Sequence, residues 1–80
     1  MKEPVNTKKF RQELGITVRR RRHKLDLSQE DFADEAGIHR TYVSSIELGK
    51  VDVGVGVIYK LAKALNISLS KLIKEVENNL

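Results

Sequence analysis

The sequence predicts an all-α domain built from five short helices. Apolar residues recur at intervals of three and four along most of the chain, which is the period of an amphipathic helix. Proline is absent after Pro4, and serine, glycine and asparagine stand where short helices would begin and end. With 80 residues and no internal repeat, linker or low-complexity stretch, we expect a single domain over residues 1–80. A core this small leaves stability marginal, so association with a second copy would help.

The first helix is expected over about residues 7–24. The residues expected to face inward repeat at helical spacing and are Phe10, Leu14, Val18 and Leu25. Gly15 interrupts this stretch and is expected to be a weak point that the helix tolerates.

A second helix is expected to begin at Ser28. Ser28 and Asp31 have the spacing of a capping box, in which the hydroxyl accepts a hydrogen bond from a free backbone N–H. Gly37 is expected to end the helix because glycine readily adopts a positive φ. The inward face is expected to be Phe32, Ala33 and Ala36.

The third helix is expected at about residues 40–48, after a connection of only residues 37–39. Val43 and Ile46 lie three apart on one face, and Gly49 follows the last turn. A tight turn with glycine between two short helices is the helix-turn-helix arrangement. The sequence therefore predicts this motif at about residues 29–48.

Two further helices complete the predicted fold. The fourth is expected at about residues 53–65 and ends before Asn66, which suits a left-handed terminal position. A short extended piece near Val51 is the alternative for its valine-rich approach. Ser68 is expected to cap the fifth helix, at about residues 69–77.

Charge is unevenly distributed along the chain, which has a net charge of +4. Most of the basic residues lie in residues 1–24, whereas the charged residues within 28–48 are all acidic except Arg40. A basic pole favours a polyanionic partner, although a charge run also occurs as a merely solvated face. No run approaches the length of a membrane span, and the polar segment 1–10 lacks the hydrophobic region of a signal peptide. We therefore expect a cytoplasmic protein without a membrane partner.

The residue types argue against an enzyme and against a metal site. There is no cysteine, so disulfides and thiolate ligands are excluded. His39 is expected to be a polar cap or a phosphate neighbour rather than a metal ligand, and His23, whose immediate neighbours are all basic, is interpreted in the same way. No nucleophile–base pair is suggested by spacing. We expect no catalytic residue, no cofactor and no small-molecule substrate.

One stretch has a specific resemblance. Residues 27–50, LSQEDFADEAGIHRTYVSSIELGK, followed by IYKLAKALN at 58–66 and ISLSKL at 67–72, resemble the Cro and phage-repressor (XRE-like) helix-turn-helix family. The resemblance covers roughly residues 18–73. It implies a lambda-repressor-like DNA-binding domain whose partner is a double-stranded DNA operator.

The third helix is then the recognition helix, whose first turns reach base edges in the major groove. Its residues expected to contact bases point away from Val43 and Ile46 and are Arg40, Thr41, Ser44 and Ser45. Arg40 is the strongest candidate because its planar fork can pair with guanine O6 and N7.

Four residues are expected to contact phosphates. Gln29 lies at a helix N-terminus, which attracts anions, and the resemblance implies the same contact. Lys50 and His39 flank the recognition helix, and Tyr42 either places its hydroxyl on a phosphate or is partly buried in the core.

The arginines of the first helix are expected to have different roles. The resemblance implies that Arg22 pairs with Glu47 and supports the recognition helix together with Val43 and Ile46. Of Arg19, Arg20 and Arg21, we expect one or two near phosphates and the rest solvated. The chain departs from the family pattern at Asp26, where glycine is usual, and at Leu48, where a polar residue is usual. Val51 and Asp52 stand where a second base and a small polar residue are common, which weakens the expected phosphate contacts of that loop.

A single recognition helix reads few base pairs, so we expect a homodimer on a near-palindromic operator. The expected interface lies on the fifth helix at Leu69, Ile73 and Val76; the alternative is that these residues only close the core. Residues 39–47 and the chain length resemble controller proteins of restriction–modification systems, which implies control of its own operon and of the nuclease gene, with RNA polymerase as a further partner. The alternatives are a phage- or plasmid-type repressor, an antitoxin, and a protein-interaction module that does not bind DNA.

Overall fold

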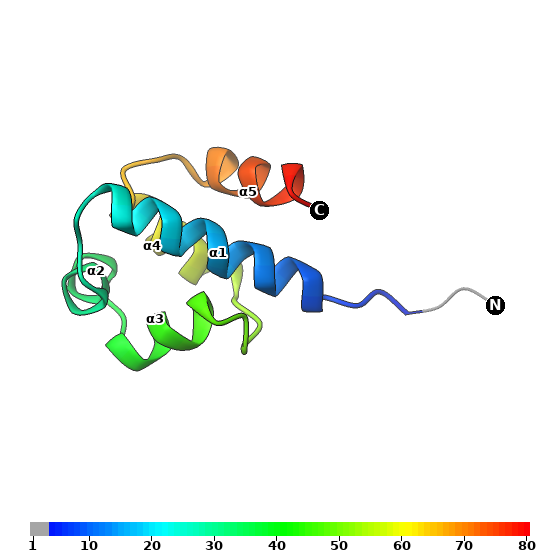
Figure 1. Cartoon of the computed structure of the whole chain (residues 1–80), viewed down its shortest axis with the longest axis horizontal. Helices are drawn as coiled ribbons and strands as arrows, with labels where there is room; N and C mark the ends of the chain where they lie inside the picture. The colour runs from blue at the N-terminus through cyan, green and yellow to red at the C-terminus, as the bar shows by residue number, and fades with distance from the viewer. Residues whose placement is uncertain (1–3) are drawn as a thin grey trace.

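Five α-helices and no strand make up residues 4–80, the part of the chain that the computed structural model describes. The helices are α1 (Lys8–Lys24), α2 (Gln29–Ala36), α3 (Arg40–Glu47), α4 (Val55–Ala64) and α5 (Leu69–Asn78). In Figure 1, α1 crosses the middle of the molecule with α3 below it and α5 above it. The predicted all-α, five-helix fold is confirmed. Of the polar segment 1–10, residues 1–3 lie outside the described residues.

The helix ends follow the local signals in the sequence. The Ser28 hydroxyl accepts a hydrogen bond from the Asp31 N–H at 3.0 Å, and Ser68 caps α5 in the same way from Lys71 at 3.1 Å. Gly37 and Asn66 both have a positive φ, of 71° and 63°. These four boundaries are confirmed because each depends only on neighbouring residues.

The fourth helix begins later than predicted. Gly54 is extended and acts as its N-cap, so α4 begins at Val55. The segment near Val51 forms no strand among the described residues and instead links α3 to α4 as a loop.

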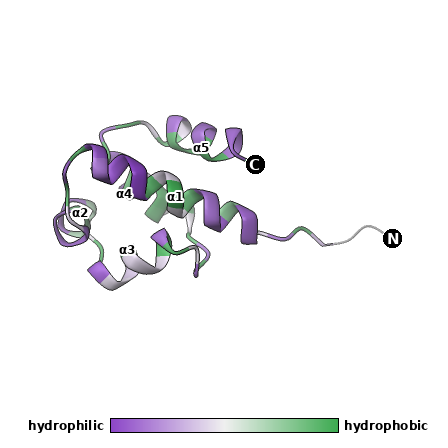
Figure 2. Cartoon of the chain, in the orientation of Figure 1, coloured by the Kyte–Doolittle hydropathy of each residue, from purple (hydrophilic) through white to green (hydrophobic). Residues whose placement is uncertain are grey.

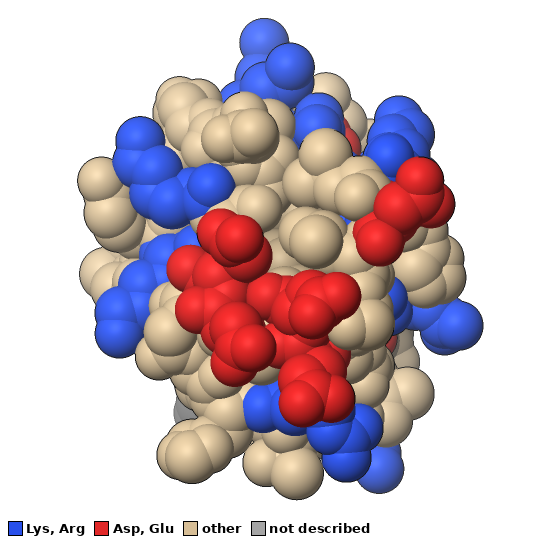
Figure 3. Space-filling view, turned by 90° about the vertical axis from the view of Figure 1, so that its left-hand side faces the viewer, with Lys and Arg blue, Asp and Glu red and all other residues tan. Residues whose placement is uncertain are grey.

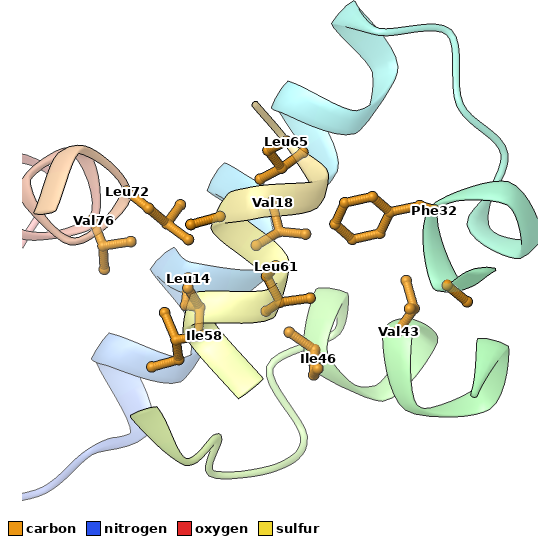
Figure 4. Close-up of a cluster of buried hydrophobic side chains, with 12 residues drawn as sticks. Leu14, Val18, Phe32, Val43, Ile46, Ile58, Leu61, Leu65, Leu72 and Val76 are labelled. Carbon is orange, nitrogen blue, oxygen red and sulfur yellow. The ribbon is translucent and has the colours of Figure 1, made fainter. Parts of the chain in front are cut away.

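The core lies where all five helices meet, as Figure 4 shows. Its largest contributors are almost fully buried and come from every helix: Leu14, Val18, Phe32, Val43, Ile46, Ile58, Leu61, Leu65, Leu72 and Val76. The prediction that Leu25 faces inward is wrong, since this side chain is 43% exposed. Leu25 is the C-cap of α1, where the chain has left the helix and helical spacing no longer sets its direction.

Asp26 occupies a strained position in the turn between α1 and α2. Its φ is 55°, in the left-handed region where a side chain costs about 1–2 kcal/mol and glycine costs almost nothing. Aspartate tolerates this region better than most residues, so the turn forms without glycine.

None of the helices in residues 4–80 has the length and apolar character that crossing a membrane requires.

Candidate nucleic-acid interface

The recognition helix α3 has one buried side and one open side. Val43 and Ile46 are buried in the core, while Arg40 and Thr41 are exposed. Ser44 and Ser45, one turn further along, are half-buried. Figure 2 shows α3 as a pale ribbon, because small hydroxyl residues form much of it. The four residues predicted to contact bases thus share one helix, and α3 can approach another surface closely.

The residues predicted to contact phosphates surround that helix. His39 is the exposed N-cap of α3 and makes no side-chain cap hydrogen bond, and Lys50 is exposed after its last turn. Gln29 is the first residue of α2 and is half-buried. Tyr42 is also half-buried and packs against the core, which is the alternative that the sequence left open for it.

A buried hydrogen-bonded network holds the end of α3. The Arg22 guanidinium donates from Nε to Glu47 Oε2 at 2.7 Å and from Nη2 to Oε1 at 3.0 Å. Gln29 Nε2 donates to the same Oε1 at 3.1 Å, and Arg22 Nη1 donates to the Leu27 carbonyl at 2.8 Å. The side chains of Arg22 and Glu47 are only 8% and 3% exposed. One arginine therefore connects α1, the turn before α2, and the C-terminus of α3.

This network has two consequences for the site. A buried pair of charges is tolerated because each is matched, and removing one partner leaves an uncompensated buried charge. It also fixes the Gln29 amide at the N-terminus of α2, with one of its two N–H groups directed to Glu47. Sequence reasoning assigned Gln29 a phosphate role only and missed its bond to Glu47.

Gly15 lies in close contact with the last turn of α3. A Cβ built on Gly15 would lie 2.4 Å from the Ile46 carbonyl oxygen and 2.5 Å from that of Glu47. Gly15 is buried, and α1 approaches α3 this closely only because no side chain intervenes. The expectation that Gly15 is merely a tolerated weak point is therefore wrong. Helix propensity alone could not reveal this role, because the contact lies more than thirty residues away in the chain.

The loop after α3 is attached to the start of α1. Thr7 Oγ1 donates to Asp52 Oδ1 at 2.9 Å, and Arg11 Nη1 lies 3.4 Å from the same oxygen. Arg11 also donates from Nε to the Gly49 carbonyl at 3.4 Å. Asp52, which the sequence suggested only as a departure that weakens DNA contacts, thus helps to hold the loop that carries Lys50.

Two arginines of the run in α1 contact α5. Arg21 donates from Nε to Glu75 Oε2 at 2.8 Å and also through Nη2, and Arg20 Nη2 lies 3.4 Å from Oε1. The hydrogen bond from Arg21 is the main cause that holds the pKa of Glu75 below its ordinary value, against the opposing effect of partial burial. The expectation that Arg21 is solvated or near a phosphate is therefore wrong, because Glu75 holds its guanidinium. Arg20 also contacts Glu75 but stays exposed, as does Arg19.

The residues predicted for a dimer interface divide into two kinds. Leu69 and Ile73 are half-buried at the edge of the core, whereas Val76 is fully buried within it. The assignment of Val76 to an interface is wrong, because a side chain with no exposed surface has none to offer a partner. Helical spacing groups all three on one side of α5 but does not say how much of that side α1 covers.

The face on which α2 lies is strongly acidic. Figure 3 shows acidic side chains gathered at its centre with basic ones around them. The exposed acids that α2 contributes are Glu30, Asp31, Asp34 and Glu35. The acidic part of this face repels a polyanion and so disfavours a nucleic acid there.

Among the described residues no three histidine, aspartate or glutamate side chains are grouped so that they could hold a metal ion.

Comparisons with known proteins agree with this geometry. A helix-turn-helix family model matches residues 18–72. The control protein C.MunI of a Mycoplasma species is 46% identical over 57 residues, which cover 71% of this chain and 77% of the relative. The control protein C.BamHI of Bacillus amyloliquefaciens is 40% identical over 68 residues, 84% of each chain. Among solved structures, the restriction–modification controller protein C.AhdI from Aeromonas hydrophila matches with a TM-score of 0.75 and 37% identity, over 78% of this chain and 94% of that one.

Proposed function

Because this chain belongs to the helix-turn-helix family of DNA-binding transcriptional regulators, we propose that it is the controller protein of a restriction–modification system. In this role it binds a near-palindromic operator as a homodimer in the cytoplasm and controls its own operon and the endonuclease gene. The observation that carries the proposal is the open hydroxyl-rich face of α3, anchored to α1 through Arg22 and Glu47, in a chain similar to controller proteins. Members of this family regulate transcription and are not enzymes.

We assign the base contacts to the open face of α3. Arg40 is exposed at the first turn, where the fork of its guanidinium can pair with guanine O6 and N7 in the major groove. Thr41, Ser44 and Ser45 are small enough to let the helix approach the bases, and their hydroxyls both donate and accept.

We assign the phosphate contacts to residues around α3. Gln29 presents its amide and the free backbone N–H groups of the α2 N-terminus to one phosphate. Lys50 and His39 bracket α3 on the exposed surface. The ring of Tyr42 packs against the core, and we assign the fourth phosphate contact to its hydroxyl. These contacts position the protein on DNA, whereas the contacts of α3 choose the sequence.

The dimer is expected to form through α5. Leu69 and Ile73 leave part of their apolar surface outside the core, and a two-fold contact through them would place two recognition helices on successive half-sites. RNA polymerase is the further partner that control of transcription implies.

Selection of binding sites from random duplex DNA tests the proposal. We expect an enriched near-palindrome whose half-sites are about 34 Å apart, bound with an affinity that falls steeply as salt rises. Equilibrium sedimentation with that DNA should give two chains per site. Binding without salt dependence or sequence preference would indicate a protein-interaction module instead. Neighbouring genes for a methyltransferase and an endonuclease would separate a controller from a phage-type repressor or an antitoxin.

A further inference from the structure

Leu48, the residue directly after α3, presents an apolar side chain to solvent. It is the C-cap of the recognition helix, and it is 59% exposed. Single exposed apolar residues are common on protein surfaces, so exposure alone gives Leu48 no role. Its position relative to the residues of α3 that we assign to base contacts does.

The backbone of Leu48 continues the helix, so helical spacing gives the direction of its side chain. Its N–H donates to the Ser44 carbonyl at 3.1 Å, which is the bond of an α-helix, and its backbone angles are right-handed helical. Successive residues of a helix point about 100° apart, so Leu48 points about 140° away from Val43 and about 160° away from Ile46. Because these two residues are buried in the core, Leu48 points out of it.

Leu48 also lies in the middle of the open face of α3. Around the helix axis its direction is about 40° from that of Ser44 and about 20° from that of Thr41, on opposite sides. Along the axis it lies one turn beyond Ser44, about 6 Å further from the start of the helix. The face that we assign to base contacts therefore ends in an isobutyl group.

The backbone on both sides of Leu48 is held against α1. Before it, Glu47 accepts two hydrogen bonds from the buried Arg22 guanidinium. After it, the Gly49 carbonyl accepts a hydrogen bond from Arg11 Nε at 3.4 Å, and a Cβ built on Gly49 would lie 3.1 Å from the backbone of α1. Leu48 is thus presented from a fixed position, which lowers the cost of ordering it on binding.

The chemistry of the major groove offers one suitable partner for this side chain. Most groups at the base edges there are hydrogen-bond donors and acceptors, whereas thymine presents an apolar C5 methyl group. Contact between this methyl and the leucine removes apolar surface of both from water, which is favourable. Lys50, exposed two residues further along, places a positive charge beside Leu48 for the neighbouring phosphates.

We propose that Leu48 is a specificity-determining residue that contacts the C5 methyl group of a thymine in the major groove, one helical turn beyond the base contact of Ser44. The proposal rests on the binding of α3 in the major groove described above. It does not depend on how two copies of the chain pair.

The test removes the methyl group and the leucine separately and together. Each thymine of the selected duplex is replaced in turn by deoxyuridine, which lacks only the C5 methyl, and binding of the full chain is measured by fluorescence anisotropy. At one thymine the wild type should lose about fourfold in affinity, the effect of exposing about one CH₂ group. Leu48→Ala should bind the unmodified duplex at least about fourfold more weakly and should lose nothing further when that thymine is replaced.

Two variants serve as controls. Leu48→Met keeps an apolar side chain and should keep the loss on deoxyuridine. Leu25→Ala truncates another exposed leucine at a helix C-cap, but Leu25 lies beside Lys63 and Asn66, away from α3, so both affinities should match those of the wild type. Leu48→Ala should melt like the wild type, because substitutions of exposed residues change stability little. If it does not fold, Leu48→Asn, which has a similar branched shape but is polar, replaces it.

Three results would overturn the inference and leave the proposed function standing. Equal losses on deoxyuridine in the wild type and in Leu48→Ala would show that another residue contacts the methyl. Weaker binding of Leu48→Ala to all sequences alike would indicate a contact with the DNA backbone. A changed sedimentation mass of Leu48→Ala without DNA would place Leu48 in a contact between protein chains. A wild type that selects no duplex would contradict the proposed function itself, and the inference with it.

Discussion

At the scale of single residues, the tertiary surroundings give chemically identical side chains different roles. Arg22 is buried against Glu47, Arg21 is half-buried against Glu75, and Arg19 is exposed. Arg40 is also exposed, but it lies on the recognition helix. A count of basic residues predicts a polyanionic partner, yet it cannot say which arginines are free to meet that partner.

The division between base and phosphate contacts is testable at this scale. Arg40→Ala should flatten the preference among operator variants, because it removes about 1–3 kcal/mol of discrimination at one base pair. Lys50→Ala should weaken binding to all sequences alike and reduce the salt dependence by about one phosphate contact. Fluorescence anisotropy on a panel of operator variants at several salt concentrations measures both effects. A uniform loss in both variants would contradict the division.

Thr17 offers a second prediction for a single residue. Its side chain is fully buried, and its hydroxyl has no hydrogen-bond partner among the described residues. Thr17→Val removes this unsatisfied group while keeping the shape, so the free energy of unfolding should rise by about 1 kcal/mol. Urea denaturation followed by circular dichroism measures the change. An unchanged or lower midpoint would mean that the hydroxyl is satisfied by a buried water.

At the scale of elements, α1 is the support on which the DNA-binding parts are assembled. It contacts α3 through Gly15 and Arg22, and it holds the following loop through Arg11, which reaches Gly49 and Asp52. The recognition helix has only 8 residues, too few for stability in isolation, so its position depends on these contacts.

Gly15→Ala tests the contact between α1 and α3. The added methyl would meet two backbone carbonyls, which cannot move as a flexible side chain can. We expect the overpacking cost, about 1–3 kcal/mol, to exceed the gain of about 1 kcal/mol in helix propensity. The variant should therefore melt at a lower temperature and bind its operator more weakly.

Gly56→Ala is the control for that variant. Gly56 lies in the first turn of α4, and a Cβ there would meet no atom within 4 Å. It should stabilise the chain by up to about 1 kcal/mol through propensity alone. If both alanines stabilise the protein, the contact at Gly15 is looser than its geometry indicates.

At the scale of the whole molecule, the charge distribution determines which surface can face DNA and how the stability of the fold depends on pH. The acidic face of α2 keeps a polyanion away from one side (Figure 3), while the exposed Arg40 and Lys50 lie at or just after α3. The ion pairs of Arg20 and Arg21 with Glu75, which join α1 to α5, depend on an ionised Glu75. The pKa of Glu75 is lowered chiefly by the hydrogen bond from Arg21.

Because of these ion pairs, the stability of the fold should decrease at low pH. A carboxylate whose pKa is lower in the folded state stabilises the fold above its unfolded pKa, about 4.3, and this stabilisation disappears as the pH falls through the lower folded value. Glu75→Gln should melt below the wild type at pH 7, by a few degrees for a partly exposed pair of up to about 1 kcal/mol. The gap should close as the pH falls from 7 through the lowered pKa of Glu75. Calorimetry across this range measures it, and a gap independent of pH would contradict the assignment.

Features that depend on neighbouring residues were predictable from the sequence by itself. Ser28 and Ser68 cap their helices, Gly37 and Asn66 end theirs, and Val43 and Ile46 face the core because spacing and backbone chemistry act over a few residues. Only the tertiary structure decided the rest. Gly15, Asp52 and Glu75 acquire their roles from partners 31 to 55 positions away in the chain, and Val76 is buried because α5 lies against α1. Contacts of this kind follow from how helices pack against one another, which the periodicity of a single helix does not specify.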